Sequence, residues 1–387
     1  MKPNTLKQKS NRNIYYPALL QPFLSFLMAT VTIVSLILCG IFISGCTNPK
    51  KYYSKNDFYS VCKIDAHFHY NTTNLEILKK ARSVKFGLVS PNVDTESSLD
   101  KQWSVSDSIL SRKEQGIAFL CSFKAENVFL PDFNDSTKKY IEQCLSQGAS
   151  GIKIWKNIGM ELKDTSGKYI MADDLLFDPI FRWIEKNHIP LLAHLGEPRN
   201  CWLPLEAMTD EGDKKYYKQH PEYHMFLHPE MPSYEDQIRA RDHLLAKYPA
   251  IPFVGAHLGS LEWNTDSLAI RFDRYPNFSV DMAARIEHIK QQSRESYNKV
   301  RDFFIHYQDR ILYGTDMEAM PSPPGTTAPP FDEILKKWLN DWIYLATDST
   351  INNCKGLKLP SSVIDKIYYQ NALRAYNLPK NFVSENR

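Results

Sequence analysis

Four apolar runs in the chain end on residues that can bind a metal. The run VCKIDAH ends at His67, and a second histidine, His69, follows two positions later. LLAH ends at His194, VGAH ends at His257, and YGT is followed by Asp316. Two side chains at i and i+2 on a strand point to the same side, so His67 and His69 can together hold one divalent ion.

The runs that carry these residues are part of a regular alternation. Eight short, almost continuously apolar segments read as strands: 61–67, 85–90, 116–123, 151–155, 189–194, 251–257, 277–283 and 310–315. Amphipathic stretches at helical spacing lie between them, at 72–83, 135–148, 178–188 and 234–249. Strands that are apolar on both faces are typical of parallel sheets covered by helices.

Eight strand–helix units predict an α/β fold with a single closed (β/α)8 barrel, a TIM barrel, over residues 61–387. An open doubly wound sheet is the alternative, but it usually carries a glycine-rich turn after its first strand, and DAHFHYNTT is not one. A barrel brings the carboxyl ends of its strands to one rim. Long connections at 196–233 and 316–330 follow two of these ends, and loops of that length are often functional.

With these motifs in place, the chain resembles the amidohydrolase superfamily, in particular its amidohydrolase-related branch, also called amidohydrolase family two. The resemblance covers roughly residues 61–376. It rests on the H-x-H pair, on the strand-end histidines and Asp316, and on the late segment IDKIYYQNALRAYNL, which is similar to the family's closing helix.

The resemblance implies roles for the strand-end residues. His67, His69, His194 and Asp316 would ligate one or two divalent ions, with zinc as the expected metal. Asp316 would also act as a base and proton shuttle, and His257 would polarise the substrate. The implied reaction is hydrolysis of a lactone, ester or amide bond in a small molecule by metal-activated water.

Lys153 lies within the strand segment GIKIW, where a buried cation needs an explanation. Three interpretations stay open from the sequence. In some binuclear relatives a carboxylated lysine at this position bridges two metals. Alternatively, the ammonium binds a substrate carboxylate, or it forms a structural pair with an acidic residue.

Other residues near the predicted rim are candidates for substrate binding. Lys156 follows the same strand, and Glu197 and Arg199 follow His194 closely, although a surface ion pair or a turn would explain the latter two equally well. The loop at 196–233 also contains three histidines four residues apart, which would share one face of a helix, together with aromatic residues that are suited to covering a substrate: His220, His224, His228, Trp202, Tyr216, Tyr217 and Tyr223.

Two further functions remain open because a fold alone does not select a reaction. The same branch includes metal-dependent decarboxylases of unsaturated carboxylic acids, for which Lys153, Lys156 or Arg199 would hold the carboxylate. A non-catalytic binding protein on a barrel scaffold is the third possibility. The net charge of +3 offers no argument for a nucleic-acid partner. Homo-oligomerisation is left open.

The N-terminal segment predicts a location outside the cytoplasm. Basic residues precede the long apolar run at 23–46, as in a secretory signal. Its ending, ISGC, resembles the bacterial lipobox, which predicts cleavage before Cys46 and lipid attachment to it. An uncleaved membrane anchor is the alternative. Residues 1–45 would then be the signal or anchor and 46–60 a tether to the membrane. Five other cysteines without C-x-x-C spacing predict mostly free, buried thiols.

Overall fold

The computed structural model describes residues 50–95, 98–320 and 331–383, and within them all eight predicted strands are present. Most are shorter than predicted, and β1, β6 and β7 end before His67, His194 and His257. In chain order the strands are β1 (Lys63–Asp65), β3 (Phe86–Pro91), β4 (Ile117–Leu120), β5 (Ile152–Ile154), β6 (Leu191–Ala193), β7 (Phe253–Gly255), β8 (Phe278–Asp281) and β9 (Ile311–Leu312).

The eight strands close into one parallel barrel. Hydrogen-bonded ladders run in the order β1-β3-β4 and β5-β6-β7-β8-β9. Backbone hydrogen bonds join the two groups at both seams: Cys121 N donates to Gly151 O over 3.0 Å, and Ala66 N donates to Tyr313 O over 2.8 Å. The predicted (β/α)8 barrel is therefore confirmed, and the open doubly wound sheet is excluded.

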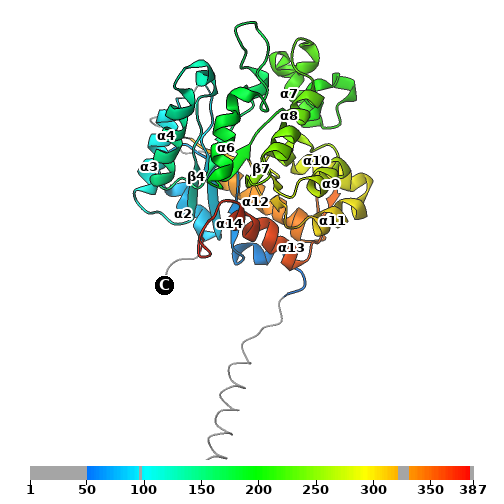
Figure 1. Ribbon diagram of the computed structural model, residues 1–387. Helices are drawn as coiled ribbons and strands as arrows, with labels where there is room; N and C mark the ends of the chain where they lie inside the picture. The colour runs from blue at the N-terminus through cyan, green and yellow to red at the C-terminus, as the bar shows by residue number, and fades with distance from the viewer. Residues whose placement is uncertain (1–49, 96–97, 321–330, 384–387) are drawn as a thin grey trace, which may run out of the picture. The chain divides into compact units, whose positions relative to one another are not determined.

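Helices follow the strands and surround the barrel (Figure 1). They are α2 (Glu76–Ser83), α3 (Leu99–Leu110), α4 (Phe133–Ser146), the short α5 (Asn157–Met160), α6 (Asp178–Lys186), α7 (Glu211–Gln219), α8 (Tyr234–Lys247), α9 (Thr265–Arg274), α10 (Ile286–Glu295), α11 (Tyr297–His306), α12 (Phe331–Ala346), α13 (Ser361–Asp365) and α14 (Asn371–Ala375). Two small ladders complete the list, β2 (His69–Tyr70) with β10 (Glu318–Ala319) and β11 (Thr350–Ile351) with β12 (Cys354–Lys355).

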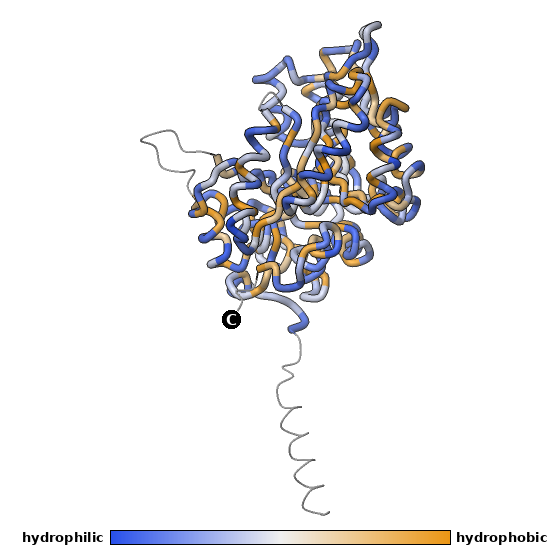
Figure 2. The backbone as a smooth tube through the Cα atoms, turned by 60° about the vertical axis from the view of Figure 1, so that its left-hand side comes forward, coloured by the Kyte–Doolittle hydropathy of each residue, from blue (hydrophilic) through white to orange (hydrophobic). Residues whose placement is uncertain are grey.

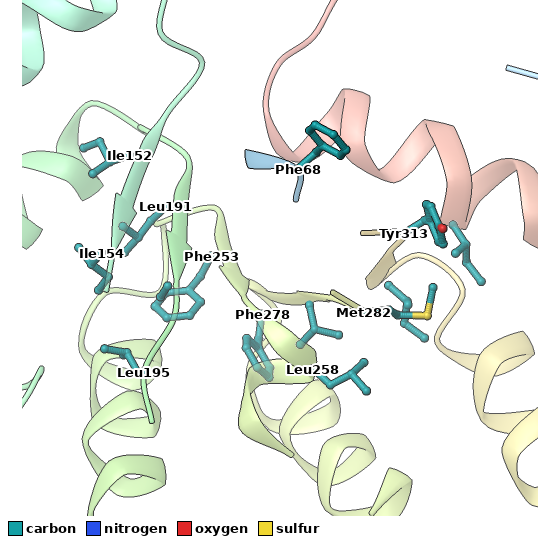
Figure 3. Packing of buried hydrophobic residues seen from close by; sticks show 14 of the residues in the cluster. Phe68, Ile152, Ile154, Leu191, Leu195, Phe253, Leu258, Phe278, Met282 and Tyr313 are labelled. Atoms are coloured by element: carbon teal, nitrogen blue, oxygen red, sulfur yellow. The ribbon is translucent and has the colours of Figure 1, made fainter. Parts of the chain in front are cut away.

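Two apolar layers hold the barrel together. The outer layer lies between strands and helices and includes Ile152, Ile154 and Leu191 (Figure 3). The inner layer fills the barrel and includes Leu192 and Val254, together with residues of the C-terminal segment after α14. Figure 2 shows hydrophobic and hydrophilic residues alternating along the chain, as expected for helices and strands that turn only one face to these layers.

This alternation places the side chain of Lys153 inside the barrel. Its neighbours on β5, Ile152 and Ile154, belong to the outer layer, and successive side chains of a strand point to opposite faces. In the ladder Lys153 is paired with Leu192, which belongs to the inner layer. The lysine is only 1% exposed.

The connection at 196–233 forms a folded insertion after β6. It contains the 3-10 turns η4 (Arg199–Trp202), η5 (Leu205–Ala207), η6 (Pro221–Tyr223) and η7 (Met225–Leu227) around α7. A separate apolar cluster, which includes Cys201, Met208 and Tyr217, gives the insertion its own small core. The stretch with the three spaced histidines is not one helix, because η6 and η7 are separate turns, so the histidines do not share a helical face.

The described N-terminal residues belong to the barrel body. Residues 52–59 were expected to form part of the tether, but Tyr52 forms a bridge to Pro360 and the side chain of Phe58 is fully buried. The predicted signal, Cys46 and the loop 321–330 lie outside the described residues. Among the residues that are described, no helix has the length and apolar character needed to cross a bilayer.

The five cysteines after residue 60 are free in the structure, and all but Cys62 are buried. This confirms the prediction of mostly free, buried thiols.

We expect truncation of the inner layer to destabilise the barrel directly beneath the rim. Leu192→Ala should lower the free energy of unfolding by about 2–5 kcal/mol, because a fully buried leucine loses its packing and leaves a cavity. The measurement is urea unfolding of the Leu192→Ala variant and of the parent protein. Ile270→Ala, at a site 60% exposed, is the control and should change stability by less than about 0.5 kcal/mol.

Candidate metal centre and active site

The H-x-H pair behaves as its spacing predicts. Phe68 turns outward into the outer apolar layer, while the rings of His67 and His69 lie on the other side with their centroids 5.2 Å apart. β1 ends at Asp65, so both histidines stand beyond the regular strand, at the carboxyl end of the barrel. Parallel strands present their carboxyl ends at one rim, and this rim carries the site.

His67, His69 and Asp316 form the tightest group of metal-type donors at the rim. The Nε2 atoms of His67 and His69 lie 3.3 and 3.2 Å from Oδ1 of Asp316. Burial alone would raise the pKa of the Asp316 carboxyl, but the neighbouring histidines hold it well below its usual range. Asp316 therefore supplies an ionised carboxylate, the form that binds a metal.

The backbone around Asp316 is held in an uncommon conformation. Its φ is +66°, and its N–H donates to His67 O over 2.8 Å. Thr315 donates from N and from Oγ1 to the buried carboxylate of Asp65, which also accepts from the indole of Trp338 on α12. Asp65 therefore connects the end of β1 to the chain that follows β9.

Asp281, at the end of β8, orients His67. Its Oδ2 lies 2.8 Å from Nδ1 of His67, and its Oδ1 accepts the backbone N–H of His257. Burial would raise the pKa of Asp281, but the His67 imidazole outweighs it and the pKa stays below its usual range. A carboxylate acceptor places the proton of His67 on Nδ1, which leaves the Nε2 lone pair for a metal.

His257 and His194 complete a row of imidazoles. The ring of His257 lies 5.0 Å from that of His67 and 4.2 Å from that of His194. Burial, above all, lowers the pKa of His257 to about 3 and that of His194 well below its usual value, so both are neutral. His257 Nδ1 lies 2.9 Å from the Ala283 carbonyl, so Nδ1 carries the proton and Nε2 is an acceptor.

The nitrogen Nε2 of His194 supports metal binding. It is buried and has no hydrogen-bond partner among the described residues; the nearest carboxylate oxygen, on Glu197, is 4.0 Å away. A buried nitrogen lone pair without a partner is costly unless another group occupies the space. The donor set of neutral imidazoles and one carboxylate therefore fits a divalent ion. His194 lies beside the group of His67, His69 and Asp316 rather than within it.

Lys153 contacts a histidine rather than an acid. Its Nζ lies 3.4 Å from Nε2 of His67, and no carboxylate of the described ranges is within ion-pair distance. Burial lowers the pKa of Lys153 to about 8. A full ammonium next to the metal-facing nitrogen would oppose a cation there, so the contact favours the neutral amine or its carbamate over a structural ion pair.

Of the three predicted substrate-binding residues, two lie at the site and one does not. Lys156 lines the same cavity as the histidines, and its ammonium forms an ion pair with Glu197. The guanidinium of Arg199 stacks on Trp263, 4.3 Å from the ring centroid, and Arg199 is not among the described residues that line this cavity. Lys156 and Glu197 thus stand at the site, whereas the expected contact of Arg199 with substrate finds no support.

The site opens into a cavity of about 600 Å³. Its walls come from the strand ends and from α3, which contributes Lys101, Gln102 and Val105. Sequence reasoning missed this helix because no pattern marks it as facing the rim. It also did not place Asp281 or Asp65 at the site, although each is an acid near the end of a predicted strand, the signal that identified Asp316.

Comparisons with known proteins agree with this geometry. A family model described as Amidohydrolase matches residues 124–378, more than half of the chain. No curated protein matches. Among solved structures, a TIM-barrel protein from Bordetella bronchiseptica is 14% identical, with a TM-score of 0.48, and the match covers 82% of this chain and 99% of that one.

Two other similar structures are named for their reactions. A 2,6-dihydroxybenzoate decarboxylase from Rhizobium is 14% identical, with a TM-score of 0.48 and coverage of 82% and 99%. A 4-oxalomesaconate hydratase from Rhodopseudomonas palustris is 13% identical, with a TM-score of 0.44 and coverage of 82% and 96%. These activities are those of the neighbours, and likeness at this level carries no argument about a reaction.

The role of Asp281 generates a prediction about metal affinity. Asp281→Asn keeps the size of the side chain but removes the charge that fixes the His67 proton, so affinity for Zn²⁺ should fall by about 10–100-fold. Competition with a chromophoric chelator measures it. Asp309→Asn, at a site 53% exposed and paired with Lys366, is the matched control. Equal affinities in the two variants would contradict the role of Asp281.

Proposed function

Because the chain belongs to the amidohydrolase family, in its family-two branch, we propose that it is a metal-dependent hydrolase. The observation that carries the proposal is the convergence of His67, His69 and Asp316, whose donor atoms all lie within 4.8 Å of one another, at the rim of the barrel. The proposed substrate is a small lactone, ester or amide.

The residues divide the chemistry as follows. His67, His69, His194 and Asp316 would hold the ion. A bound divalent ion, zinc for example, would supply a water with its pKa lowered to about 7. Asp316, ionised and close to the histidines, would accept the proton of that water.

The hydrogen bond of His257 fixes the order in which its ring accepts and donates a proton. With Nδ1–H donated to Ala283 O, its Nε2 accepts a proton first and donates one only afterwards. A neutral His257 therefore cannot polarise a carbonyl oxygen by donation. It would polarise the substrate, or protonate the leaving group, only after it had received a proton through Asp316.

A metal-dependent decarboxylase is the second candidate. Lys101 lines the cavity and provides a cation for a substrate carboxylate, and Lys153 would add a second one only in its protonated form. Lys156, by contrast, is already neutralised by Glu197. The ion pair therefore removes one of the cations that the decarboxylase would need for its substrate carboxylate. For this reason we rank hydrolysis first.

Replacing the proposed base tests the proposal. Asp316→Asn should lower turnover by about 10²–10⁴-fold, because the variant cannot accept the proton. The measurement is turnover of metal-loaded, full-length protein against a panel of lactones, esters and amides, with carbon dioxide release followed in parallel. Asp266→Asn, at an exposed site, is the control.

Each outcome of the panel has a meaning. Removal of the metal by a chelator should abolish turnover, and added Zn²⁺ should restore it. Carbon dioxide release without hydrolysis would establish the lyase. If the metal-loaded protein turns over no substrate of either kind, both enzymatic functions are contradicted and the non-catalytic binding protein is the function that remains.

We further propose that the protein is a lipoprotein outside the cytoplasm, attached to the membrane through Cys46. The support is the sequence of the apolar run and of ISGC alone. Cys46→Ala should abolish incorporation of labelled palmitate in a bacterial host and leave the signal uncleaved. Cys62→Ala is the matched control. Unchanged labelling of the Cys46 variant would contradict lipidation.

A further inference from the structure

A second cavity adjoins the metal centre. It measures about 1030 Å³, and it shares Thr95, Trp155 and Lys156 with the inner cavity. The insertion after β6 supplies much of its wall, including Tyr216 and Tyr223. A ligand that enters the inner cavity thus has an outer chamber beside it, and Lys156, which pairs with Glu197, lines both.

The outer cavity has an acidic wall. Six carboxylates face it, from Asp94, Glu126, Glu161, Glu197, Glu222 and Glu230, against only two lysines, Lys124 and Lys156. Carboxylates accept hydrogen bonds and repel anions. The inner cavity is more evenly charged, with lysines 101, 153 and 156 and the acids Asp316 and Glu318 in its wall beside the histidines. The two chambers therefore suit different parts of one molecule.

Two exposed tyrosines with nearly parallel rings stand in the outer wall. The rings of Tyr216, on α7, and Tyr223, on η6, are inclined by only 13°, with centroids 6.4 Å apart. They are 47% and 55% exposed, unlike Tyr217, which is buried in the core of the insertion. Exposed, nearly parallel rings that combine an apolar face with a polar hydroxyl are suited to stacking on a flat ligand.

These observations point to a ligand with many hydrogen-bond donors and a flat apolar face. Sugars have both, since their hydroxyls donate to carboxylates and one side of the ring is lined by C–H groups. An acidic sugar does not fit, because the wall is already rich in carboxylates. An amino group on the sugar would add attraction.

We propose that the outer cavity binds a neutral or amino-bearing glycosyl group of the substrate, while the inner cavity binds the part that reacts. The proposal deepens the proposed function and rests on it only in taking the inner cavity as the site of reaction. The lactone, ester or amide would accordingly be a glycoside-like molecule rather than an isolated small acid derivative.

Binding of defined disaccharides tests the proposal without turnover. The probes are cellobiose, which is neutral, the glucosamine disaccharide, which is cationic, and digalacturonate, which is anionic. Calorimetry uses the metal-loaded, full-length chain in a detergent without a sugar headgroup. Cellobiose and the glucosamine disaccharide should bind, and digalacturonate should bind at least about tenfold more weakly.

Variants locate the binding. Tyr216→Ala and Tyr223→Ala should each weaken cellobiose binding by about tenfold or less, and the double variant by more, because the stacking surface is lost. Tyr216→Phe should retain binding, since the ring remains. Tyr59→Ala, at a tyrosine 50% exposed that lines neither cavity, is the control and should bind as the parent does.

A charge variant tests the acidic wall separately. Glu222→Gln combined with Glu230→Gln should improve digalacturonate binding and weaken binding of the glucosamine disaccharide, because two negative charges are removed from the wall. Equal binding of all three probes, no binding of any, or full cellobiose affinity in the double tyrosine variant would each overturn the proposal. Sugar binding that persists in Asp316→Asn separates this site from catalysis, so failure of the proposed reaction and failure of the outer site are distinguishable.

Discussion

The seam between β1 and β9 is the contact on which the candidate site depends. The hydrogen bond from Ala66 N to Tyr313 O closes the barrel there, and Asp65 reinforces it through Thr315. His67 stands on one side of the seam and Asp316 on the other. Without this closure, the first and last strands would carry the donors of the metal centre at opposite edges of a sheet.

Burial determines the charge states at the rim. Water is excluded from His67, His257 and His194, so their pKa values fall and they stay neutral, as metal ligands and proton acceptors must be. Asp281 is fully buried and the Asp316 side chain is 32% exposed, and the histidines around them hold both ionised. The same low dielectric lowers the pKa of Lys153 to about 8, which makes its neutral form accessible.

The barrel and the insertion contribute different properties to the protein. The barrel positions donors on strand ends, which are rigid and therefore suited to holding an ion. The insertion after β6 places exposed tyrosines and carboxylates beside the inner cavity. Chemistry and substrate selection thus come from separate parts of the chain, a division that is common where loops surround a fixed scaffold.

The sequence by itself determined the barrel, its eight strands and the residues that end them, because strand burial and strand count are recorded in local apolar patterns. It also identified Lys153 as a residue in need of an explanation. Only the tertiary structure decided the partners: Asp281 on His67, Glu197 on Lys156, Trp263 under Arg199 and α3 in the cavity wall. These contacts join residues far apart in sequence, so no local pattern contains them. Lys153 illustrates the difference, since its alternation with Ile152 and Ile154 predicts a buried strand, whereas its contact with His67 exists only in the closed barrel.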